Sequence, residues 1–494
     1  MSTLPEQAVE YRTFYIGGEW VQPAGAGQIT VTSPVNEEVV GITPDGVDAD
    51  VDRAVVAARS AYDQQGGWAS WTPEERGEVL ERFAVEMDAR AADSAVRTTM
   101  SNGMPFALSQ QLEGGLPGAF VRYYVGLATA QQREEIRPGF LGGPALLRRY
   151  PIGVVAAIVP WNFPQALTFA KIAPLLAVGC TVVLKPSPET VLDAYTVAEA
   201  ADAAGVPAGV INVVPGGRET GAYLVRHPGV DKVAFTGSTA AGRSIGEACG
   251  RLLRPVTLEL GGKSAAIVLD DADLASNLEA LFGACLINNG QTCWLNSRIL
   301  APRGRHDEVV ELLASLASGA TIGDPFDEAT QVGPLVSARQ RDRVEGYIAQ
   351  GIEGGARVAT GGGRPDGLDR GFYVEPTVFA NVSPDAVIAR EEIFGPVLSV
   401  IPYDGVDDAV RLANDSEYGL GGTVWTTDHE KGLAVARRIQ TGAIGINQFF
   451  TDPSAPFGGV KSSGLGREMG VEALSTFQEL QTVYLDPAGP VPEV

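Results

Sequence analysis

Strands and helices alternate regularly from residue 152 onwards, and this pattern constrains the fold more than any other feature of the chain. Short runs of small and β-branched apolar residues, at 153–159 and 181–185, are each followed by a helical pattern that ends at a glycine, Gly179 or Gly205. The strands show no polar alternation, so both faces of each strand should be buried. This succession predicts a parallel sheet that is covered by helices on both faces.

The helix predicted at residues 188–204 has clear boundary signals. Ser187 is the expected N-cap, Pro188 lies in the first turn, and Gly205 follows as the stop. A second alternating block begins near residue 264 and predicts another α/β unit. Its expected strands lie at 264–269, 298–300, 397–401, 422–425 and 443–447.

The C-terminal run at residues 478–485 reads as a strand that is separated from both sheets in sequence. We expect it to pair either with the extended segment 145–151 or with a neighbouring subunit. At the other end of the chain, residues 14–20 have the pattern of a hairpin that precedes an alanine-rich helix from about Val51.

Length and charge narrow the class of protein. A chain of 494 residues is too long for one compact core, so two or three domains are expected. The formal charge is 37 − 60 = −23, which repels phosphates and argues against nucleic acid or an anionic membrane surface as partner.

Cysteine and histidine usage argues against a metal site. The four cysteines form no CxxC pair and there are three histidines, so we expect neither a zinc site nor a disulfide framework. The N-terminus lacks the basic and apolar regions of a secretion signal, and no apolar run approaches the ~20 residues that span a bilayer. We therefore expect a cytoplasmic location.

Three short strings carry groups that suit covalent chemistry on a carbonyl. Cys293 closes the string NGQTC, Glu259 lies 34 residues upstream in TLELGGK, and Asn162 lies in PWNFP. A thiolate can attack the carbonyl, a carboxylate can later activate water, and an amide can stabilise an oxyanion.

In this order the three strings resemble the NAD(P)-dependent aldehyde dehydrogenase superfamily. Three further strings strengthen the resemblance, which extends from about residue 14 to 485: FTGSTAAG at 235–242, EEIFGP at 391–396 and PFGGVKSSGLGRE at 456–468. The resemblance implies an α/β fold with three parts. They are a Rossmann-like NAD(P)-binding domain (residues 1–125 and 149–260), an α/β catalytic domain (261–475) and a small β oligomerisation arm (126–148 and 476–494). Such relatives are homo-oligomers, usually dimers or tetramers.

The resemblance also assigns roles in aldehyde oxidation. Cys293 is the expected nucleophile, and Asn162 with the Cys293 N–H is expected to stabilise the thiohemiacetal oxyanion. Glu259 is expected to activate the water that hydrolyses the thioester. Lys171 and Glu468 match positions that form a polar relay behind this base.

The expected cofactor is NAD, and NADP is not excluded. Lys185 matches a lysine that contacts the adenosine ribose, and Glu392 matches a glutamate that binds the nicotinamide ribose. Pro188 stands where NAD-preferring relatives often carry a glutamate. Because that carboxylate is missing, it cannot repel the 2′-phosphate of NADP. The full set of expected cofactor residues is Pro160, Trp161, Lys185, Ser187, Pro188, Gly217, Gly221, Phe235, Gly237, Ser238, Gly242, Leu260, Gln340, Glu392 and Phe394.

The positions expected to line the substrate tunnel are aromatic or apolar and include no arginine. We therefore expect a medium to large hydrophobic aldehyde, whether aromatic, terpenoid or aliphatic, rather than a dicarboxylic semialdehyde, which needs a cation. Ala170 is smaller than the aromatic residue that many relatives carry there. The positions are Tyr123, Tyr124, Phe163, Leu167, Ala170, Trp294, Phe449 and Phe450.

Three alternatives stay open at this point. An aromatic cage would suit betaine aldehyde. A CoA-acylating semialdehyde dehydrogenase is the second, although such relatives usually lack the counterpart of Glu259. The third is a non-catalytic structural or binding protein on the same fold, against which the intact Cys293, Glu259 and Asn162 argue.

Overall fold

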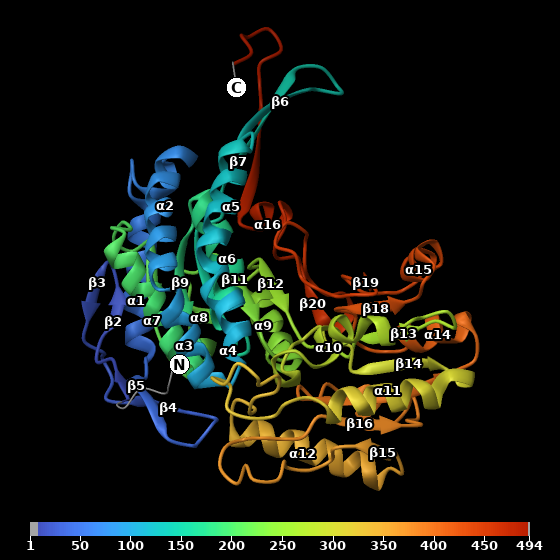
Figure 1. Cartoon of the computed structure of the whole chain (residues 1–494). Coiled ribbons are helices and arrows are strands. Elements are labelled where there is room, and N and C mark those ends of the chain that lie inside the picture. Colours follow the sequence, from blue (N-terminus) through green and yellow to red (C-terminus); the bar gives the residue numbers. More distant parts are fainter. Residues whose placement is uncertain (1–7, 493–494) are drawn as a thin grey trace.

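The computed structural model of the chain describes residues 8–492 and contains two large sheets and two three-stranded ones. In Figure 1 the blue and green elements surround the first sheet, the yellow and orange elements surround the second, and a narrow arm projects at the top. This architecture confirms the α/β fold class. No helix within residues 8–492 is long and apolar enough to cross a membrane.

The first sheet contains the strands predicted between residues 152 and 260. In order across the sheet, they are β20 (Gly464–Leu465), β12 (Val256–Glu259), β11 (Lys232–Thr236), β8 (Val154–Ile158), β9 (Thr181–Lys185), β10 (Ile211–Val213), β2 (Phe14–Ile16) and β3 (Glu19–Val21). The run from β12 to β10 is parallel. β20 is antiparallel to β12, so a segment from the C-terminal part of the chain lies beside Glu259.

Helices cover both faces of this sheet, as the unbroken apolar strands predict. Val154, Ala156 and Ile158 of β8 face one core, and the intervening Val155 and Ala157 face another. The first core includes α1 (Asp48–Asp63), α8 (Arg218–Arg226) and α9 (Thr239–Arg251). The second includes α2 (Pro73–Ala89), α5 (Leu116–Ala130), α6 (Pro164–Val178) and α7 (Val191–Ala203).

The predicted helix ends are confirmed, but one predicted helix start is wrong. Gly179 and Gly205 follow α6 and α7 with φ of +103° and +67°. Ser187 does not cap α7, because its hydroxyl donates to the carboxylate of Glu189 (2.5 Å) instead of accepting a helix N–H. Residues Pro188–Thr190 form a short 3-10 helix, η3, and α7 begins only at Val191.

The second sheet is the predicted second α/β unit. Its strands, in order, are β15 (Arg357–Thr360), β16 (Thr377–Ala380), β17 (Val397–Tyr403), β14 (Arg298–Pro302), β13 (Ala265–Val268), β18 (Gly422–Trp425) and β19 (Gly445–Ile446). All pairs are parallel except β15 with β16. Its helices are α10 (Leu278–Leu286), α11 (His306–Ser318), α12 (Ala338–Glu353), α13 (Val387–Arg390), α14 (Val406–Asn414) and α15 (His429–Ala436).

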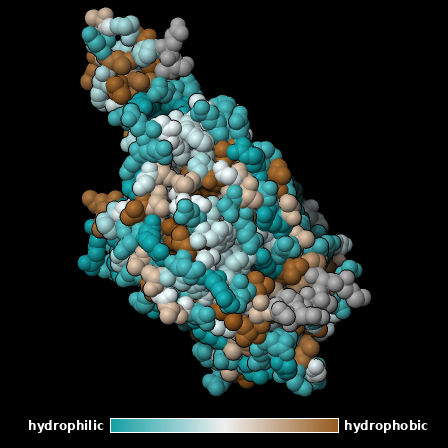
Figure 2. Space-filling view, turned by 90° about the vertical axis from the view of Figure 1, so that its left-hand side faces the viewer, coloured by the Kyte–Doolittle hydropathy of each residue, from teal (hydrophilic) through white to brown (hydrophobic). Residues whose placement is uncertain are grey.

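The arm confirms the predicted pairing of the C-terminal strand. β21 (Gln478–Tyr484) pairs antiparallel with β7 (Pro144–Pro151), and β7 pairs with β6 (Glu134–Pro138). Apolar residues gather at the projecting tip in Figure 2, and Phe140 and Leu141 in the β6–β7 loop are almost fully exposed. The remaining elements are β1 (Val9–Glu10), β4 (Gln28–Thr32), β5 (Val39–Pro44), α3 (Ala91–Asn102), α4 (Phe106–Ser109) and α16 (Glu472–Thr476).

Phe169→Ala tests the packing of the helices on the first sheet. The Phe169 ring is fully buried on α6 and stacks on Phe83 of α2, with ring centroids 5.8 Å apart. Its removal should lower the free energy of unfolding by about 3–5 kcal/mol, measured by chemical denaturation. Val56→Ala is the control, because Val56 is 62% exposed on α1. Equal losses in the two variants would contradict the assigned core.

Candidate active site

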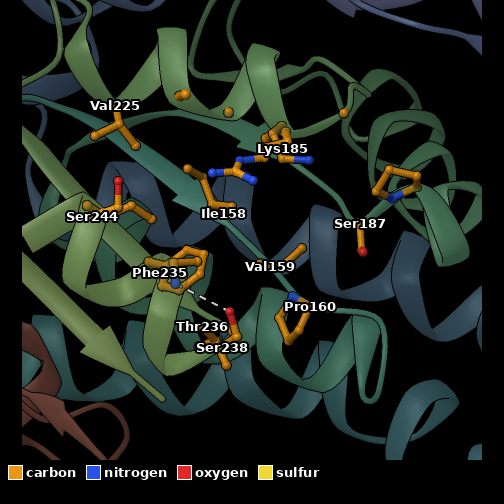
Figure 3. A pocket seen from close by; sticks show the side chains of 18 of the residues that line it. Ile158, Val159, Pro160, Lys185, Ser187, Val225, Phe235, Thr236, Ser238 and Ser244 are labelled. Carbon is orange, nitrogen blue, oxygen red and sulfur yellow. Dashed lines mark hydrogen bonds between the residues drawn. The ribbon is translucent and has the colours of Figure 1, made fainter. Parts of the chain in front are cut away.

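A cleft of about 600 Å³ opens at the C-terminal ends of the strands of the first sheet. Its walls follow β8, β9 and β11, which is where ligands bind in open α/β sheets. In Figure 3, Pro160 follows β8, Lys185 ends β9 with Ser187 beyond it, and Ser238 follows β11. The structure brings together in this cleft the predicted cofactor residues Pro160, Trp161, Lys185, Ser187, Pro188, Gly217, Gly221, Phe235, Gly237 and Ser238.

The start of α9 offers hydrogen-bond donors to the cleft. Ser238 is the N-cap, and its hydroxyl accepts from the Ala241 N–H (3.3 Å). The hydroxyl of Thr239 is buried and has no partner within residues 8–492. Because backbone N–H groups in the first turn of a helix bind anions, this turn together with the volume of the cleft fits a dinucleotide phosphate.

Lys185 places a cation at the middle of the cleft. Its Nζ donates to the carbonyl oxygens of Pro186 and Gly216, each at 2.6 Å. Burial lowers the pKa of Lys185 to about 8, although the nearby charges of Glu189 and Asp45 oppose this shift. The ammonium is therefore held by backbone carbonyls at a point where a ribose hydroxyl could also bind it.

Five predicted cofactor residues lie outside the walls of this cleft. Gly242 lets α9 approach Leu260, since a Cβ at Gly242 would lie 2.4 Å from the Leu260 side chain. Gln340 donates to the Phe394 carbonyl (2.7 Å) and so supports the loop that carries Glu392 and Phe394. The Phe394 ring meets Trp161 edge-on, with centroids 5.3 Å apart, which joins this loop to the end of the cleft.

Cys293 lies just beyond that contact. It lines a small cavity together with Glu392 and Phe394. Burial raises the pKa of the Cys293 thiol well above its usual range, and the charges of Glu392 and Glu259 raise it further. Burial also raises the pKa of Glu392, whose carboxylate accepts the Gly262 N–H at 2.9 Å. The resting thiol is therefore protonated, and a base must remove its proton before it can act as a nucleophile.

Asn162 is directed at the loop that carries the thiol. Its side-chain amide donates to the Gln291 carbonyl oxygen at 3.0 Å. An asparagine amide has two N–H donors, so one remains for a developing oxyanion. The Asn162 carbonyl accepts from the side chains of Asn288 (2.9 Å) and Asn102 (3.3 Å), which fixes its backbone.

The loop that carries Cys293, the nucleophile loop, is held in place by hydrogen bonds from two asparagines that were not singled out from the sequence. Asn288 and Asn289 have positive φ angles of 52° and 59°. The Asn289 amide donates to the carbonyls of Gly103 (2.8 Å) and Pro334 (2.9 Å). An Asn-Asn-Gly string was the available signal, because asparagine tolerates the left-handed conformation better than most residues.

Glu259 ends β12 as predicted and is buried. Neither carboxylate oxygen has a hydrogen-bond partner within the described chain. Burial raises the pKa of Glu259 well above its usual range, the charge of Glu468 raises it further, and the charge of Lys171 lowers it. Such a group can take up a proton near neutral pH.

The structure brings Lys171 and Glu468 together behind Glu259. Their side chains form a buried ion pair with a shortest N–O distance of 2.8 Å. Lys171 also donates to the hydroxyl of Thr236 at the end of β11 (2.5 Å). Residues 297 positions apart in the chain thus form one polar cluster next to the candidate base.

The candidate tunnel residues divide into three groups. Trp294 and Phe449 stack with centroids 4.7 Å apart, and Phe449 and the exposed Phe450 line a second cavity of about 420 Å³. Tyr124 and Ala170 are fully buried in the core, where the Tyr124 hydroxyl donates to the Gly470 carbonyl (3.3 Å). Tyr123, Phe163 and Leu167 are less buried and lie on α5 and at the start of α6.

Cys180 and Cys285 are buried, which confirms them as core residues.

Comparisons with known proteins agree with this arrangement. The aldehyde dehydrogenase family model matches residues 20–483. A geranial dehydrogenase of Castellaniella defragrans is 53% identical over 97% of this chain and 99% of its own, and a phenylacetaldehyde dehydrogenase of Pseudomonas fluorescens is 39% identical over 95% of each. A crystal structure of a Mycobacterium tuberculosis aldehyde dehydrogenase complexed with NAD+ superposes with a TM-score of 0.95, at 46% identity, covering 98% of this chain and 100% of that one.

The chain belongs to the aldehyde dehydrogenase family. It is an enzyme that acts on aldehydes.

Gly290→Ala tests whether the backbone fixes the nucleophile loop. Gly290 has a φ of +76°, and a Cβ there would lie 2.1 Å from the Gly395 carbonyl carbon. The loop must shift, and a displacement of about 1 Å typically costs on the order of 10²-fold in rate, measured as kcat/KM. Gly304→Ala is the control, because a Cβ at Gly304 would meet nothing within 4 Å. Wild-type activity in Gly290→Ala would contradict the close approach.

The pH–rate profile tests the charges around Glu259. As a base Glu259 must be ionised, so kcat should rise as the pH rises through its raised pKa. Lys171→Met removes a charge that lowers this pKa, and should move the rising limb to higher pH. Glu468→Gln removes a charge that raises it, and should move the limb to lower pH. Lys431→Met, which breaks a surface pair with Asp271, is the control. Unchanged profiles in both variants would refute the relay.

Proposed function

We propose that this enzyme oxidises medium to large hydrophobic aldehydes to carboxylic acids with NAD, through a thiohemiacetal and then a thioester on Cys293. One observation carries the proposal: Cys293 shares a cavity with Glu392 and Phe394, and Phe394 contacts Trp161 at the end of the dinucleotide cleft. A thiol, a cofactor site and an amide donor therefore meet at one place.

Activation of the thiol is the first step. The buried Cys293 thiol gives its proton to Glu259, whose raised pKa makes the carboxylate a competent acceptor. The thiolate then adds to the aldehyde carbon. The carbonyl oxygen becomes an oxyanion, which the free N–H of the Asn162 amide and the backbone N–H of Cys293 stabilise.

Oxidation and hydrolysis complete the reaction. When bound, NAD accepts the hydride that leaves the carbon attached to the Cys293 sulfur, so that a thioester remains. The residues that would hold NAD are Lys185 and the start of α9 in the cleft, and Glu392 and Phe394 in the cavity that they share with Cys293. Glu259 first releases to solvent the proton that it took from Cys293 and then takes a proton from water; the hydroxide adds to the thioester, and the Cys293 thiolate leaves as the acid forms. The Lys171–Glu468 pair tunes Glu259 during this step.

The apolar character of the site supports the substrate class. Trp294, which follows Cys293 in the sequence, stacks on Phe449 of the second cavity, and none of the candidate tunnel positions is an arginine. Relatives named for geranial and phenylacetaldehyde are consistent with such a pocket. A carboxylate at the far end of a substrate would find no cation among these positions.

The projecting arm supports a homo-oligomer. Phe140 and Leu141 expose almost their whole side chains at its tip, and β21 forms an edge of the three-stranded sheet. Exposed apolar tips and open strand edges are sites of subunit association. The division into three domains and the cytoplasmic location remain predictions.

Initial rates of NADH formation test this function. Benzaldehyde, citral and hexanal should be oxidised with higher kcat/KM than betaine aldehyde and succinic semialdehyde, because the pocket is apolar. Cys293→Ala should abolish turnover, and Asn162→Ala should lower kcat by about 10²–10³-fold. Cys249→Ala, which changes a buried cysteine in a different core, should retain activity. A preference for succinic semialdehyde would refute the substrate class, and turnover by Cys293→Ala would refute the nucleophile.

A further inference from the structure

An ion pair between the two α/β units lies in the lining of the dinucleotide cleft. Arg339, the second residue of α12, donates to one carboxylate oxygen of Glu189 in η3 at 3.0 Å. The other oxygen of Glu189 accepts the hydroxyl of Ser187 at 2.5 Å. All three residues line the cleft, although residues 189 and 339 are 150 positions apart in sequence.

The chemistry of the cleft indicates which part of a dinucleotide meets this pair. One end, between α8 and α9, is apolar and suits an adenine ring. It is lined by Ala222, Val225, Ala241, Ile245 and Ala248.

The other end reaches Trp161 and the Cys293 cavity, where the nicotinamide must react. Figure 3 shows Val225 and Ser244 on one side of the cleft, and Lys185, Pro160 and Ser187 toward the other. The group next to the adenine is its ribose, and this places the 2′-position near Lys185 and the Arg339–Glu189 pair.

The charges at this point are unusually favourable for an anion. Lys185, Arg218, Arg226 and Arg339 line the cleft together with the Glu189 carboxylate, Asp45 lies close enough to Lys185 to raise its pKa, and Pro188 adds neither charge nor a donor. The Arg339 side chain is 84% exposed, and exposed ion pairs contribute little to stability. A phosphate dianion can therefore replace the Glu189 carboxylate as the partner of Arg339, because a guanidinium binds phosphate in the same forked geometry as a carboxylate.

We propose that Arg339 is a specificity-determining residue that binds the 2′-phosphate of NADP, in competition with Glu189. The inference rests on the proposed placement of the dinucleotide in this cleft. With NAD bound, the Glu189 carboxylate stays paired with Arg339 and Ser187 and accepts one further hydrogen bond from the ribose hydroxyl, and Arg339 makes no contact that NAD requires. With NADP bound, the 2′-phosphate displaces Glu189, and Arg339 supplies the neutralising charge. The pair therefore sets the ratio between the two cofactors.

Binding of NADH and NADPH to the full-length protein, followed by nucleotide fluorescence, tests the inference without turnover. Arg339→Gln should weaken NADPH binding by about tenfold or more and change NADH binding by less than about threefold. Glu189→Gln should strengthen NADPH binding, since the competing carboxylate charge is gone. Arg339→Lys keeps the positive charge but loses the forked guanidinium, and its loss of NADPH affinity should be smaller than that of Arg339→Gln.

The control separates local recognition from net charge. Arg303→Gln breaks an exposed pair with Asp404 away from the cleft and makes the same change in the total charge. It should leave both affinities unchanged. The ratio of kcat/KM for NAD and NADP with hexanal should follow the binding ratio in every variant.

The outcomes distinguish this inference from the proposed function. If wild type binds NADH and NADPH but the ratio is unchanged in Arg339→Gln, or if both affinities fall equally, Arg339 does not select between the cofactors. If wild type binds NADH but shows no measurable binding of NADPH, the 2′-phosphate site is likewise refuted while the cleft stands. If wild type binds neither nucleotide, the placement of the dinucleotide itself fails.

Discussion

Close backbone contacts between the nucleophile loop and the peptide that joins the two sheets hold the reacting groups in place. A Cβ at Gly262 would lie 2.4 Å from the Cys293 carbonyl oxygen, and a Cβ at Gly261 would lie 2.4 Å from a carboxylate oxygen of Glu392. A side chain at Gly262 would collide with the backbone of Cys293, and one at Gly261 would displace the Glu392 carboxylate. Glu259 ends β12 two residues before this peptide, so base and nucleophile are positioned by the backbone rather than by flexible side chains.

The electrostatics of the site depend on local charges rather than on the net charge of −23. At physiological ionic strength, exposed charges are screened beyond about 8 Å, so distant surface carboxylates affect the cleft little. Within the site, Glu259, Glu392 and Cys293 all have raised pKa values because of burial. Glu259 must therefore be in its ionised form to take the Cys293 proton, and its raised pKa makes it a stronger base in that form.

Sequence reasoning could place residues that stand at the ends of patterned strands. Lys185 ends β9 where the apolar run at 181–185 predicted a strand end, and Glu259 ends β12 within one residue of the end of its own apolar run. The resemblance then named Cys293 and Asn162, because their strings are short and specific.

Contacts between distant parts of the chain could not be read from any local pattern. Lys171 and Glu468 were paired only through the resemblance, and the Arg339–Glu189 bridge required the arrangement of two α/β units. Ser187 was misread because a carboxylate two residues away competes with the helix for its hydroxyl, and that choice depends on η3. The tunnel is the least predictable part, because apolar and aromatic residues line tunnels and fill cores alike. Tyr124 and Ala170 are fully buried in the core.

The central claim is that a thioester forms on Cys293 and is released by Glu259. Intact-protein mass spectrometry of Glu259→Gln, mixed with NAD and one equivalent of hexanal, measures this intermediate directly. The account predicts a covalent acyl adduct that maps to Cys293, together with about one equivalent of NADH per subunit and little further turnover. Steady turnover without an adduct, or an adduct on another residue, would contradict it.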